Sequence, residues 1–382
     1  MALKQNTWTL NQWYDQDVAG NVSYTGATPL FAWGSNHSGQ LGQNQAQAQL
    51  GGASSPIQIP GSWRSVSNDQ QWNIISGVKT DGTMWAWGQN DQGQFGVNNR
   101  TLYSSPVQIP GEWSDNYVIG YLSSAMVKSD GTLWVSGFNN DGNLAQNDRT
   151  ARSSPTQVPG TWSTTEGAVI TNVYGVGAIK SDGTLWGWGA NHNGQLGVNN
   201  RTYYSSPIQI PGTTWSLLGG THYSRFGIKT DGTLWGWGHN HYGVLGLNDQ
   251  GPGTRRSSPT QIPGTWSAIA NSSAASTAAI NTDGELFMWG SNAYGQLGQN
   301  NLIQHSSPTQ VGSDTTWSKI SISNDNMSAI KTDGTLWGWG KSTGGQSGKN
   351  NMVNYSSPVQ IPGTGWSNIG SSGSAKFGLQ IN

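Results

Sequence analysis

One stretch of the sequence, residues 180–212, constrains the fold most, because it recurs with small changes about every fifty residues. It reads KSDGTLWGWGANHNGQLGVNNRTYYSSPIQIPG. Three markers each occur seven times: a Trp-Gly core in which Ser136 once replaces Trp, the proline of SSP, and a Trp that follows a Pro-Gly-type turn. A period of this length indicates a solenoid or a propeller, whatever domain count the chain length alone would favour.

The local signals within the repeat all predict β-structure. Asp182-Gly183 is typical of a tight hairpin, because Gly accepts a positive φ at no steric cost. Trp186 and Trp188 are two residues apart, so they lie on the same face of a strand, and Gly187 leaves the opposite face bare for a neighbouring sheet to approach. The prolines of SSPIQIP place that strand at the outer edge of its sheet, where Pro is tolerated. Each repeat therefore predicts four strands.

Seven four-stranded units predict an all-β, seven-bladed β-propeller. Residues 28–382 form the propeller, and residues 1–27 form an N-terminal arm that matches no part of the repeat. The repeats begin at Thr28 and end at Asn382, both at the position of the Asp-Gly hairpin. We therefore expect a composite blade, with inner strands from about residues 366–381 and outer strands from about residues 29–59, which would leave no open sheet edge.

The pattern DGTLWGWGxNxxGQLGxN, followed by SSPxQIPGTxW, resembles the repeat of the regulator of chromosome condensation family, over residues 28–382. The resemblance implies the same seven-bladed propeller. It also allows a light-sensing function, as in the plant ultraviolet-B photoreceptor, but the Gly-Trp-Arg-His-Thr segments of that receptor are missing here. We therefore interpret the tryptophans as packing between blades.

Differences among the repeats predict where a partner binds. The hairpins between the two inner strands vary freely, and they share one end of each blade with the long NxxGQLGxNN loops, whereas the TDGT and IPGTW turns at the other end are uniform. Aromatic side chains with a polar tip are enriched at interfaces. The predicted binding residues on this variable face are Trp72, Tyr121, Tyr174, His222, Tyr223, His241 and Tyr242.

The arm is the second predicted interaction element, because it holds more apolar side chains than a free tail normally does. Its anchoring residues are predicted to be Trp8, Trp13 and Tyr14. They either dock on a larger assembly or fold back over the ring, and the sequence leaves both alternatives open.

Composition excludes several classes of function. The net charge is -1 and only 10% of the residues are charged, so a nucleic-acid partner is not expected. There is no Cys, no apolar run long enough to cross a membrane, and no apolar N-terminal run of the kind that a signal peptide has. His239 and His241 could share a metal ion, but no third ligand is evident, so we predict no metal. No catalytic constellation stands out, and we predict a protein that is not an enzyme and carries no cofactor.

Among binding proteins, the motifs NNRTxYSSP and SSPxQIPGTTW resemble repeats of structural proteins from phages of marine bacteria. This resemblance implies a virion component of a tailed bacteriophage, capsid- or tail-associated, with other virion proteins and a host surface component as partners. The alternatives are a cytoplasmic propeller that acts like a guanine nucleotide exchange factor, or an enzyme inhibitor like β-lactamase inhibitor protein II. An exchange factor needs a wedge inserted at its GTPase, and the longest insertion among the repeats is four residues.

Overall fold

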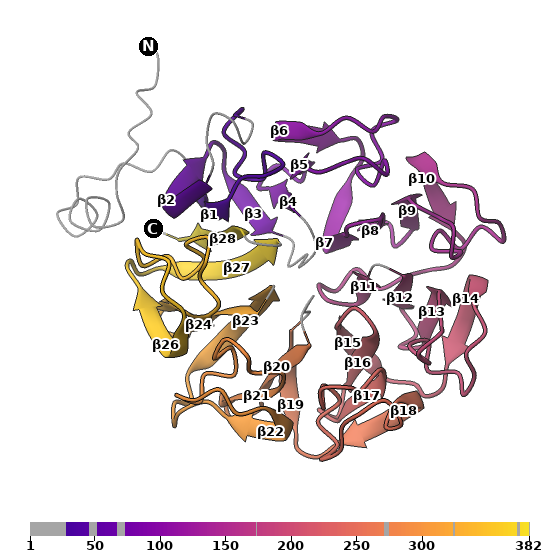
Figure 1. The fold of residues 1–382 in the computed structure, drawn as a ribbon. Coiled ribbons are helices and arrows are strands. Elements are labelled where there is room, and N and C mark those ends of the chain that lie inside the picture. The colour runs from indigo at the N-terminus through magenta and orange to yellow at the C-terminus, as the bar shows by residue number, and fades with distance from the viewer. Residues whose placement is uncertain are drawn as a thin grey trace, which may run out of the picture.

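The computed structural model describes residues 28–45, 52–66, 73–172, 174–270, 275–323, 325–372 and 375–381. These residues form seven four-stranded antiparallel sheets arranged as the blades of a ring (Figure 1). Within the described part of the chain every regular element is a strand. The predicted all-β, seven-bladed propeller is confirmed.

The blades are numbered here in chain order. Blade 1 contains β3 (Trp63–Val66), β4 (Ile74–Lys79), β5 (Met84–Gly88) and β6 (Tyr103–Ile109). Blade 2 contains β7 (Trp113–Ile119), β8 (Ser123–Lys128), β9 (Leu133–Gly137) and β10 (Arg152–Val158). Blade 3 contains β11 (Val169–Asn172), β12 (Gly175–Ile179), β13 (Leu185–Gly189) and β14 (Tyr204–Ile210). Blade 4 contains β15 (Trp215–Gly220), β16 (Ser224–Lys229), β17 (Leu234–Gly238) and β18 (Arg256–Ile262).

Blade 5 contains β19 (Trp266–Ile269), β20 (Ser276–Asn281), β21 (Leu286–Gly290) and β22 (His305–Gln310). Blade 6 contains β23 (Trp317–Ser323), β24 (Asn326–Lys331), β25 (Leu336–Gly340) and β26 (Tyr355–Ile361). The first strand of each blade lies nearest the axis, and the SSP strand lies at the rim (Figure 1).

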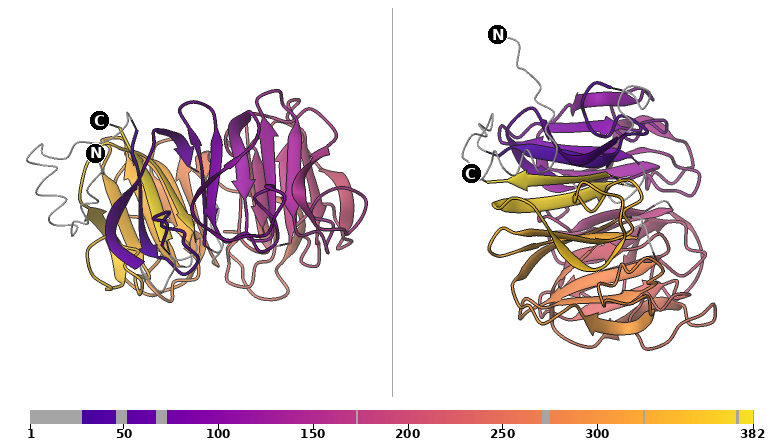
Figure 2. Two further views of the ribbon diagram at one scale, coloured as in Figure 1. Left: turned by 90° about the horizontal axis from the view of Figure 1, so that it is seen from above. Right: turned by 60° about the vertical axis from the view of Figure 1, so that its left-hand side comes forward.

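Blade 7 is composite, as the matching chain ends predict. Its strand order is β2 (Gly52–Ile59), β1 (Leu30–Ser35), β28 (Ala375–Gln380) and β27 (Trp366–Ser372). The junction runs from Leu30 opposite Leu379 to Gly34 opposite Ala375. The indigo strands from the start of the described chain therefore lie beside the yellow strands from its end (Figure 2). Since pairing across this junction closes the ring, neither pair of strands is left with an open inner edge.

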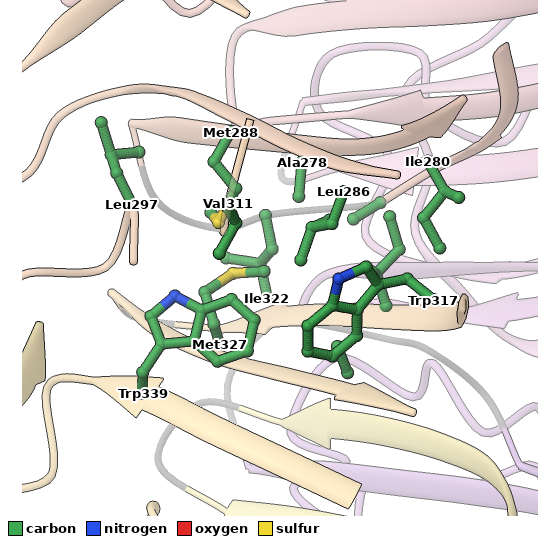
Figure 3. Close-up of a cluster of buried hydrophobic side chains, with 13 residues drawn as sticks. Ala278, Ile280, Leu286, Met288, Leu297, Val311, Trp317, Ile322, Met327 and Trp339 are labelled. Carbon is green, nitrogen blue, oxygen red and sulfur yellow. The ribbon is translucent and has the colours of Figure 1, made fainter. Parts of the chain in front are cut away.

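The hydrophobic core is divided among the seven junctions between blades. In blade 4, Trp215 and Trp237 pack against the aliphatic face of blade 3, with their ring centroids 5.9 Å apart. Trp317 and Trp339 of blade 6 take the equivalent positions against Leu286 of blade 5 (Figure 3). The interpretation of the tryptophans as packing between blades is confirmed for these positions.

The two tryptophans of each WxW pair differ in burial, which the strand pattern alone did not predict. Trp237 is 1% exposed, and its Nε1 donates to the carbonyl of Gln195 in the preceding blade, 2.9 Å away. Trp235 is only half-buried and packs against Lys229, whose Nζ lies 4.7 Å from the Trp235 ring centroid. The first Trp of each pair therefore belongs to the edge of the core and the second to its interior.

The bare face at Gly187 is covered mainly by its own blade, contrary to the expectation of a neighbouring sheet. A Cβ at Gly187 would lie 3.2 Å from Leu196 of the GQLG loop and 3.2 Å from Ile210. The loop folds back over the sheet and inserts its leucine, and the following blade then packs on this layer.

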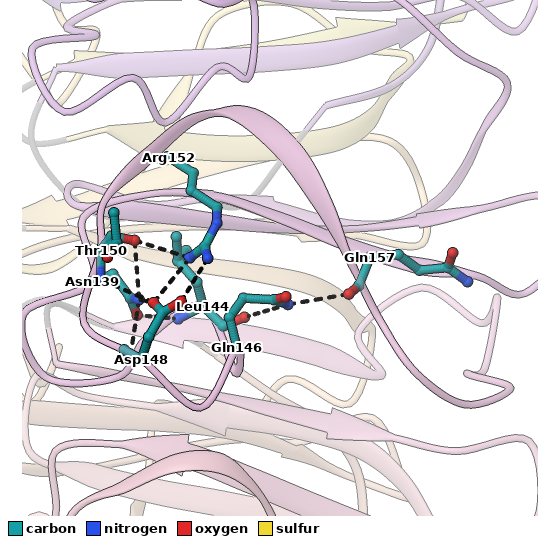
Figure 4. A network of polar contacts seen from close by, with 7 residues as sticks. All are labelled: Asn139, Leu144, Gln146, Asp148, Thr150, Arg152 and Gln157. Atoms are coloured by element: carbon teal, nitrogen blue, oxygen red, sulfur yellow. Dashed lines mark hydrogen bonds and ion pairs between the residues drawn. The ribbon is translucent and has the colours of Figure 1, made fainter.

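Six of the seven long loops are held by the amide of their first Asn, and in blade 6 the hydroxyl of Ser342 takes this place. In blade 2, Asn139 Oδ1 accepts the Leu144 N–H, 2.8 Å away, and Nδ2 donates to the Asp148 and Thr150 carbonyls (Figure 4). Arg152 forms an ion pair with Asp148 across the same loop, with a distance of 2.6 Å. These contacts all lie within one loop, so they hold its conformation without the help of a neighbouring blade.

The loops also join successive blades at the rim. The Asn199 N–H donates to the carbonyl of Ser257, which belongs to the SSP segment of the next blade, at 2.7 Å. Gly194 has a φ of +78°, and a Cβ there would lie 2.7 Å from Ser257 Cα, so only glycine permits this approach. The GQLG and SSP motifs are thus two halves of one contact between blades.

Candidate binding surface

One end of the ring carries the variable hairpins and the long loops together. In blade 4, Ser224 at the start of β16 pairs with Gly238 at the end of β17, so the β15–β16 hairpin and the loop after β17 leave the sheet at the same end. The other end carries the uniform Asp-Gly turns. We call the first end the loop face and the second the turn face.

The loop face of blades 3 and 4 carries a continuous cluster of Tyr and His rings, named here the Tyr–His cluster. Tyr174 stacks on Tyr223 of the next blade, with centroids 5.5 Å apart and an interplanar angle of 14°. His192 packs edge-on against both rings, at 5.7 and 5.6 Å. The members of the cluster are Tyr174, His192, Tyr203, His222, Tyr223, His239, His241 and Tyr242.

The cluster extends outward from this stacked pair in both directions. On one side, the Tyr203 hydroxyl lies 3.2 Å from His192 Nδ1. On the other, Tyr223 contacts His239, which stacks on His241 at 5.9 Å, and His241 contacts Tyr242 at 4.8 Å. Tyr203 and Tyr242 are 39% and 42% exposed, so the two ends of the cluster face solvent while its centre is half-buried.

The surroundings favour the uncharged form of four members of the cluster, Tyr174, His192, His222 and His239. The hydrogen bond with Tyr223, together with burial, raises the pKa of Tyr174 to about 12. Burial lowers the pKa of His222 and of His192, and for His239 burial is reinforced by the neighbouring His241 and Arg255. At neutral pH the surface therefore offers aromatic faces and neutral hydrogen-bonding tips, a combination common in protein interfaces.

Five of the predicted binding residues are brought together here: Tyr174, His222, Tyr223, His241 and Tyr242. Tyr121 lies on the same face in the β7–β8 hairpin of blade 2, outside the cluster, and its carbonyl accepts a hydrogen bond from Gln94 at 3.0 Å. Trp72 lies outside the described residues, as do Trp8, Trp13 and Tyr14 of the arm.

Sequence reasoning missed His192, Tyr203 and His239 as members of the cluster. In the sequence analysis, His239 was considered only as a possible metal ligand and His192 was not considered as a binding residue, although His192 and His241 occupy one repeated loop position. The recurrence of histidine at this loop position is the sequence signal that could have identified His192 as a member of the cluster. Among the described residues, no group of three or more His, Cys, Asp or Glu side chains is placed to hold a metal ion.

A separate cavity of about 290 Å³ lies at the axis of the ring, lined by the first strands of all seven blades. Its charged lining residues are Asp115, Glu166 and Lys319. Asp115 is already in an ion pair with Arg64, at 3.1 Å. The rest of its lining is mostly aliphatic, as expected of strands that converge on an axis. The described residues include no helix that is long and apolar enough to span a bilayer.

The fold and the two unlike faces define a class of protein, the seven-bladed β-propeller with a variable loop face. Four segments of the chain match the regulator of chromosome condensation (RCC1) repeat, at residues 81–118, 182–215, 231–275 and 283–330. These four segments are therefore similar to RCC1-type repeats.

Three known proteins resemble the chain, one in the sequence of a short segment and two in fold. The ultraviolet-B receptor UVR8 of Arabidopsis thaliana is 33% identical over 95 residues, which is 23% of this chain and 19% of the receptor. Prp20p of Saccharomyces cerevisiae superposes with a TM-score of 0.82 at 17% identity, covering 94% of this chain and 92% of its own. Human WBSCR16 superposes with a TM-score of 0.79 at 18% identity, covering 93% and 99%. At these identities the two structures establish the fold alone.

Proposed function

We propose that this chain is a non-catalytic protein-binding propeller and that the Tyr–His cluster is the centre of its binding surface. The observation that carries the proposal is the stacking of Tyr174 on Tyr223 across the junction between blades 3 and 4. The junction preorganises an aromatic platform, which reduces the entropy lost when a partner binds. The solved structure of Prp20p was described with its binding to Gsp1p and histones, which makes protein binding a reasonable function for a propeller of this type.

We further propose that the protein is a virion component of a tailed bacteriophage, with other virion proteins and a host surface component as partners. The support is the resemblance of the NNRTxYSSP and SSPxQIPG segments to repeats of phage structural proteins. The hydrogen bonds that join the long loops to the next SSP segment, six through the backbone and one through side chains, are also compatible with a particle protein that lacks cysteine. An exchange-factor role in the cytoplasm is the alternative, and the yeast structures support it through fold alone.

The experiment compares two triple variants of the full chain. Tyr203→Ala, His241→Ala and Tyr242→Ala together remove the exposed ends of the cluster, and Ser181→Ala, Thr230→Ala and Thr332→Ala change exposed residues of the turn face. We expect the first variant to lose co-sedimentation with intact phage particles and the second to retain it, with both melting near the parent temperature. Equal association of the two variants would move the binding surface away from the cluster. Absence of the parent protein from particles would reject the virion role, and binding could then be tested against a small GTPase.

The N-terminal arm provides a second attachment in this proposal, through Trp8, Trp13 and Tyr14. Deletion of residues 2–24 should leave the ring folded but abolish its association with particles. If association survives the deletion, or if the ring unfolds, the arm is not an anchor.

A further inference from the structure

A buried arginine at the junction between blades 3 and 4 has no explanation in the repeat. Arg225 is the second residue of β16, opposite Trp237 in the strand register, and is 3% exposed. The residues at the equivalent register position in the other blades are Ile75, Ser124, Val176, Thr277, Met327 and Lys376. A guanidinium therefore occupies a position that takes an uncharged side chain in five of the seven blades.

Only part of the guanidinium is satisfied by the protein. Arg225 Nη2 donates to the Gly175 carbonyl of blade 3 at 2.8 Å, whereas Nη1 is buried without a hydrogen-bond partner. Gln195 Nε2 is buried without a partner as well, whereas Gln195 Oε1 accepts the Asn193 N–H at 2.9 Å. Arg225 and Gln195 line the same small cavity, which has a volume of about 10 Å³. The two residues that carry these unpaired donors thus line one space.

The lining of this cavity offers no negative charge to balance the arginine. Its other residues are apolar or glycine: Ile170, Val176, Gly177, Leu185, Gly187, Leu196, Ile210, Leu218 and Trp237. None of the four ion pairs found among the described residues involves Arg225. An unpaired buried charge is strongly destabilising, because it has lost its hydration and gained no counter-charge.

Lys376 is a buried cationic side chain at the same register position in blade 7, and it can be compared with Arg225. Its Nζ donates to the Asn326 carbonyl at 3.3 Å, and burial lowers the pKa of Lys376 to about 7, so the amine can lose its proton. Burial lowers the pKa of Arg225 only to about 9, and the guanidinium stays charged at neutral pH. The lysine can therefore become neutral, whereas the arginine needs an anion.

We propose that the space between Arg225 Nη1 and Gln195 Nε2 is a binding site for a single small monovalent anion of the halide class. The anion neutralises the guanidinium and accepts a hydrogen bond from each donor. A water molecule could accept the same two bonds, but it would leave the charge uncompensated. Its own hydrogens would meet apolar walls, since the one side-chain oxygen of the lining, Gln195 Oε1, is already engaged.

The test measures the melting temperature of the full chain in sodium chloride or bromide against sodium gluconate at equal ionic strength. An ion that binds the folded state alone raises the melting temperature with its concentration. We expect a halide-specific rise for the parent protein. Arg225→Met should abolish this rise and still fold, because Met327 occupies the equivalent position in blade 6. Gln195→Leu should raise the halide concentration needed for half of the effect about tenfold or more, as loss of a hydrogen bond to a charged group does.

Lys376→Met is the matched control, since it removes a buried cation from the same position in another blade and should keep the halide-specific rise. The proposal is overturned if the parent melts identically in halide and gluconate, which would indicate water in the cavity. It is also overturned if Arg225→Met keeps the halide effect. Should Arg225→Met not fold, the Gln195→Leu titration decides, and an unchanged halide midpoint there rejects the site.

Discussion

At the scale of single residues, the repeat couples each lysine of the KSDG and KTDG turns to two tryptophans. Lys180 Nζ lies 4.1 Å from the Trp186 ring centroid and 5.6 Å from that of Trp162. In blades 5 and 7 the lysine is replaced by Asn281 and Gln380, and the first ring of the WxW pair becomes Phe287 and Phe31. The chain thus uses Trp, the best cation–π acceptor, in each blade that has the cation.

This coupling predicts a measurable interaction energy. Lys180→Gln should destabilise the fold by about 0.5–2 kcal/mol, the usual range for a cation–π contact. In the Trp186→Phe background the same substitution should cost less, so the double-mutant cycle from urea unfolding should give a positive coupling. Additive effects would mean that lysine contributes through its aliphatic stem alone.

The unequal burial within each WxW pair predicts unequal costs of truncation. Trp237→Ala should destabilise by about 3–5 kcal/mol, because it opens a cavity at the centre of a junction and leaves the Gln195 carbonyl without its donor. Trp235→Ala should cost clearly less, since the Trp235 ring is half-buried. Chemical denaturation of the two variants gives the comparison, and equal costs would contradict the division into core and edge.

At the scale of the element, the Asp-Gly turns of blades 1, 2, 3, 4 and 6 share one set of hydrogen bonds on the turn face. In blade 3, Asp182 Oδ1 accepts the Thr184 N–H at 2.9 Å and the Thr184 hydroxyl at 2.6 Å, and Thr184 Oγ1 accepts the Trp186 Nε1–H at 3.0 Å. The hydrogen bond from the threonine hydroxyl lowers the pKa of the turn aspartate below its ordinary value of 3.8. The same shift and the same first cause hold for Asp81, Asp130, Asp231 and Asp333.

These five turns predict a loss of stability in acid. A carboxylate with a lowered folded-state pKa contributes its full stabilisation above its unfolded pKa of 3.8 and loses it as the pH falls through the lower folded value. We therefore expect the melting temperature to fall between about pH 4 and pH 2. Asp→Asn at all five positions should flatten that profile, because asparagine keeps the acceptor oxygen and removes the titration. An unchanged profile would place the acid sensitivity elsewhere, for example at the ion pair that brings the pKa of Asp148 to about 2.

At the scale of the whole molecule, the ring depends on closure through blade 7. Strands β27 and β28 supply its inner half, and β28 pairs with β1 of the outer half. The core cluster between blades 6 and 7 also combines residues from both ends of the described chain, with Trp33 packing on Trp366 at a centroid distance of 5.9 Å. The molecule therefore has no separable half.

Removal of residues 366–382 should expose the inner edge of β1 and the aliphatic face of blade 6. We expect a large fall in melting temperature and self-association through the exposed edge. Thermal melting and sedimentation velocity measure these two effects. A truncated chain that melts within a degree or two of the parent and stays monomeric would show that closure contributes little.

Much of this architecture could be predicted from the sequence, because its determinants are local and repeated. The Asp-Gly turn, the alternation of Trp186 and Trp188 and the prolines of SSP act within one strand or hairpin, and the matching ends at Thr28 and Asn382 predicted the composite blade. The loop face could be predicted for the same reason, since two hairpins of a blade must share an end.

Contacts between blades could not be predicted in this way. Tyr174 and Tyr223 are about fifty residues apart and meet only because the ring places blade 4 against blade 3. Arg225 and Lys376 look like ordinary polar residues of a strand, and their burial depends on the face that the next blade covers. The burial of Trp237 against the partial exposure of Trp235 has the same origin. Local propensity specifies the blade, but the surroundings of a side chain between two blades depend on residues one whole repeat away.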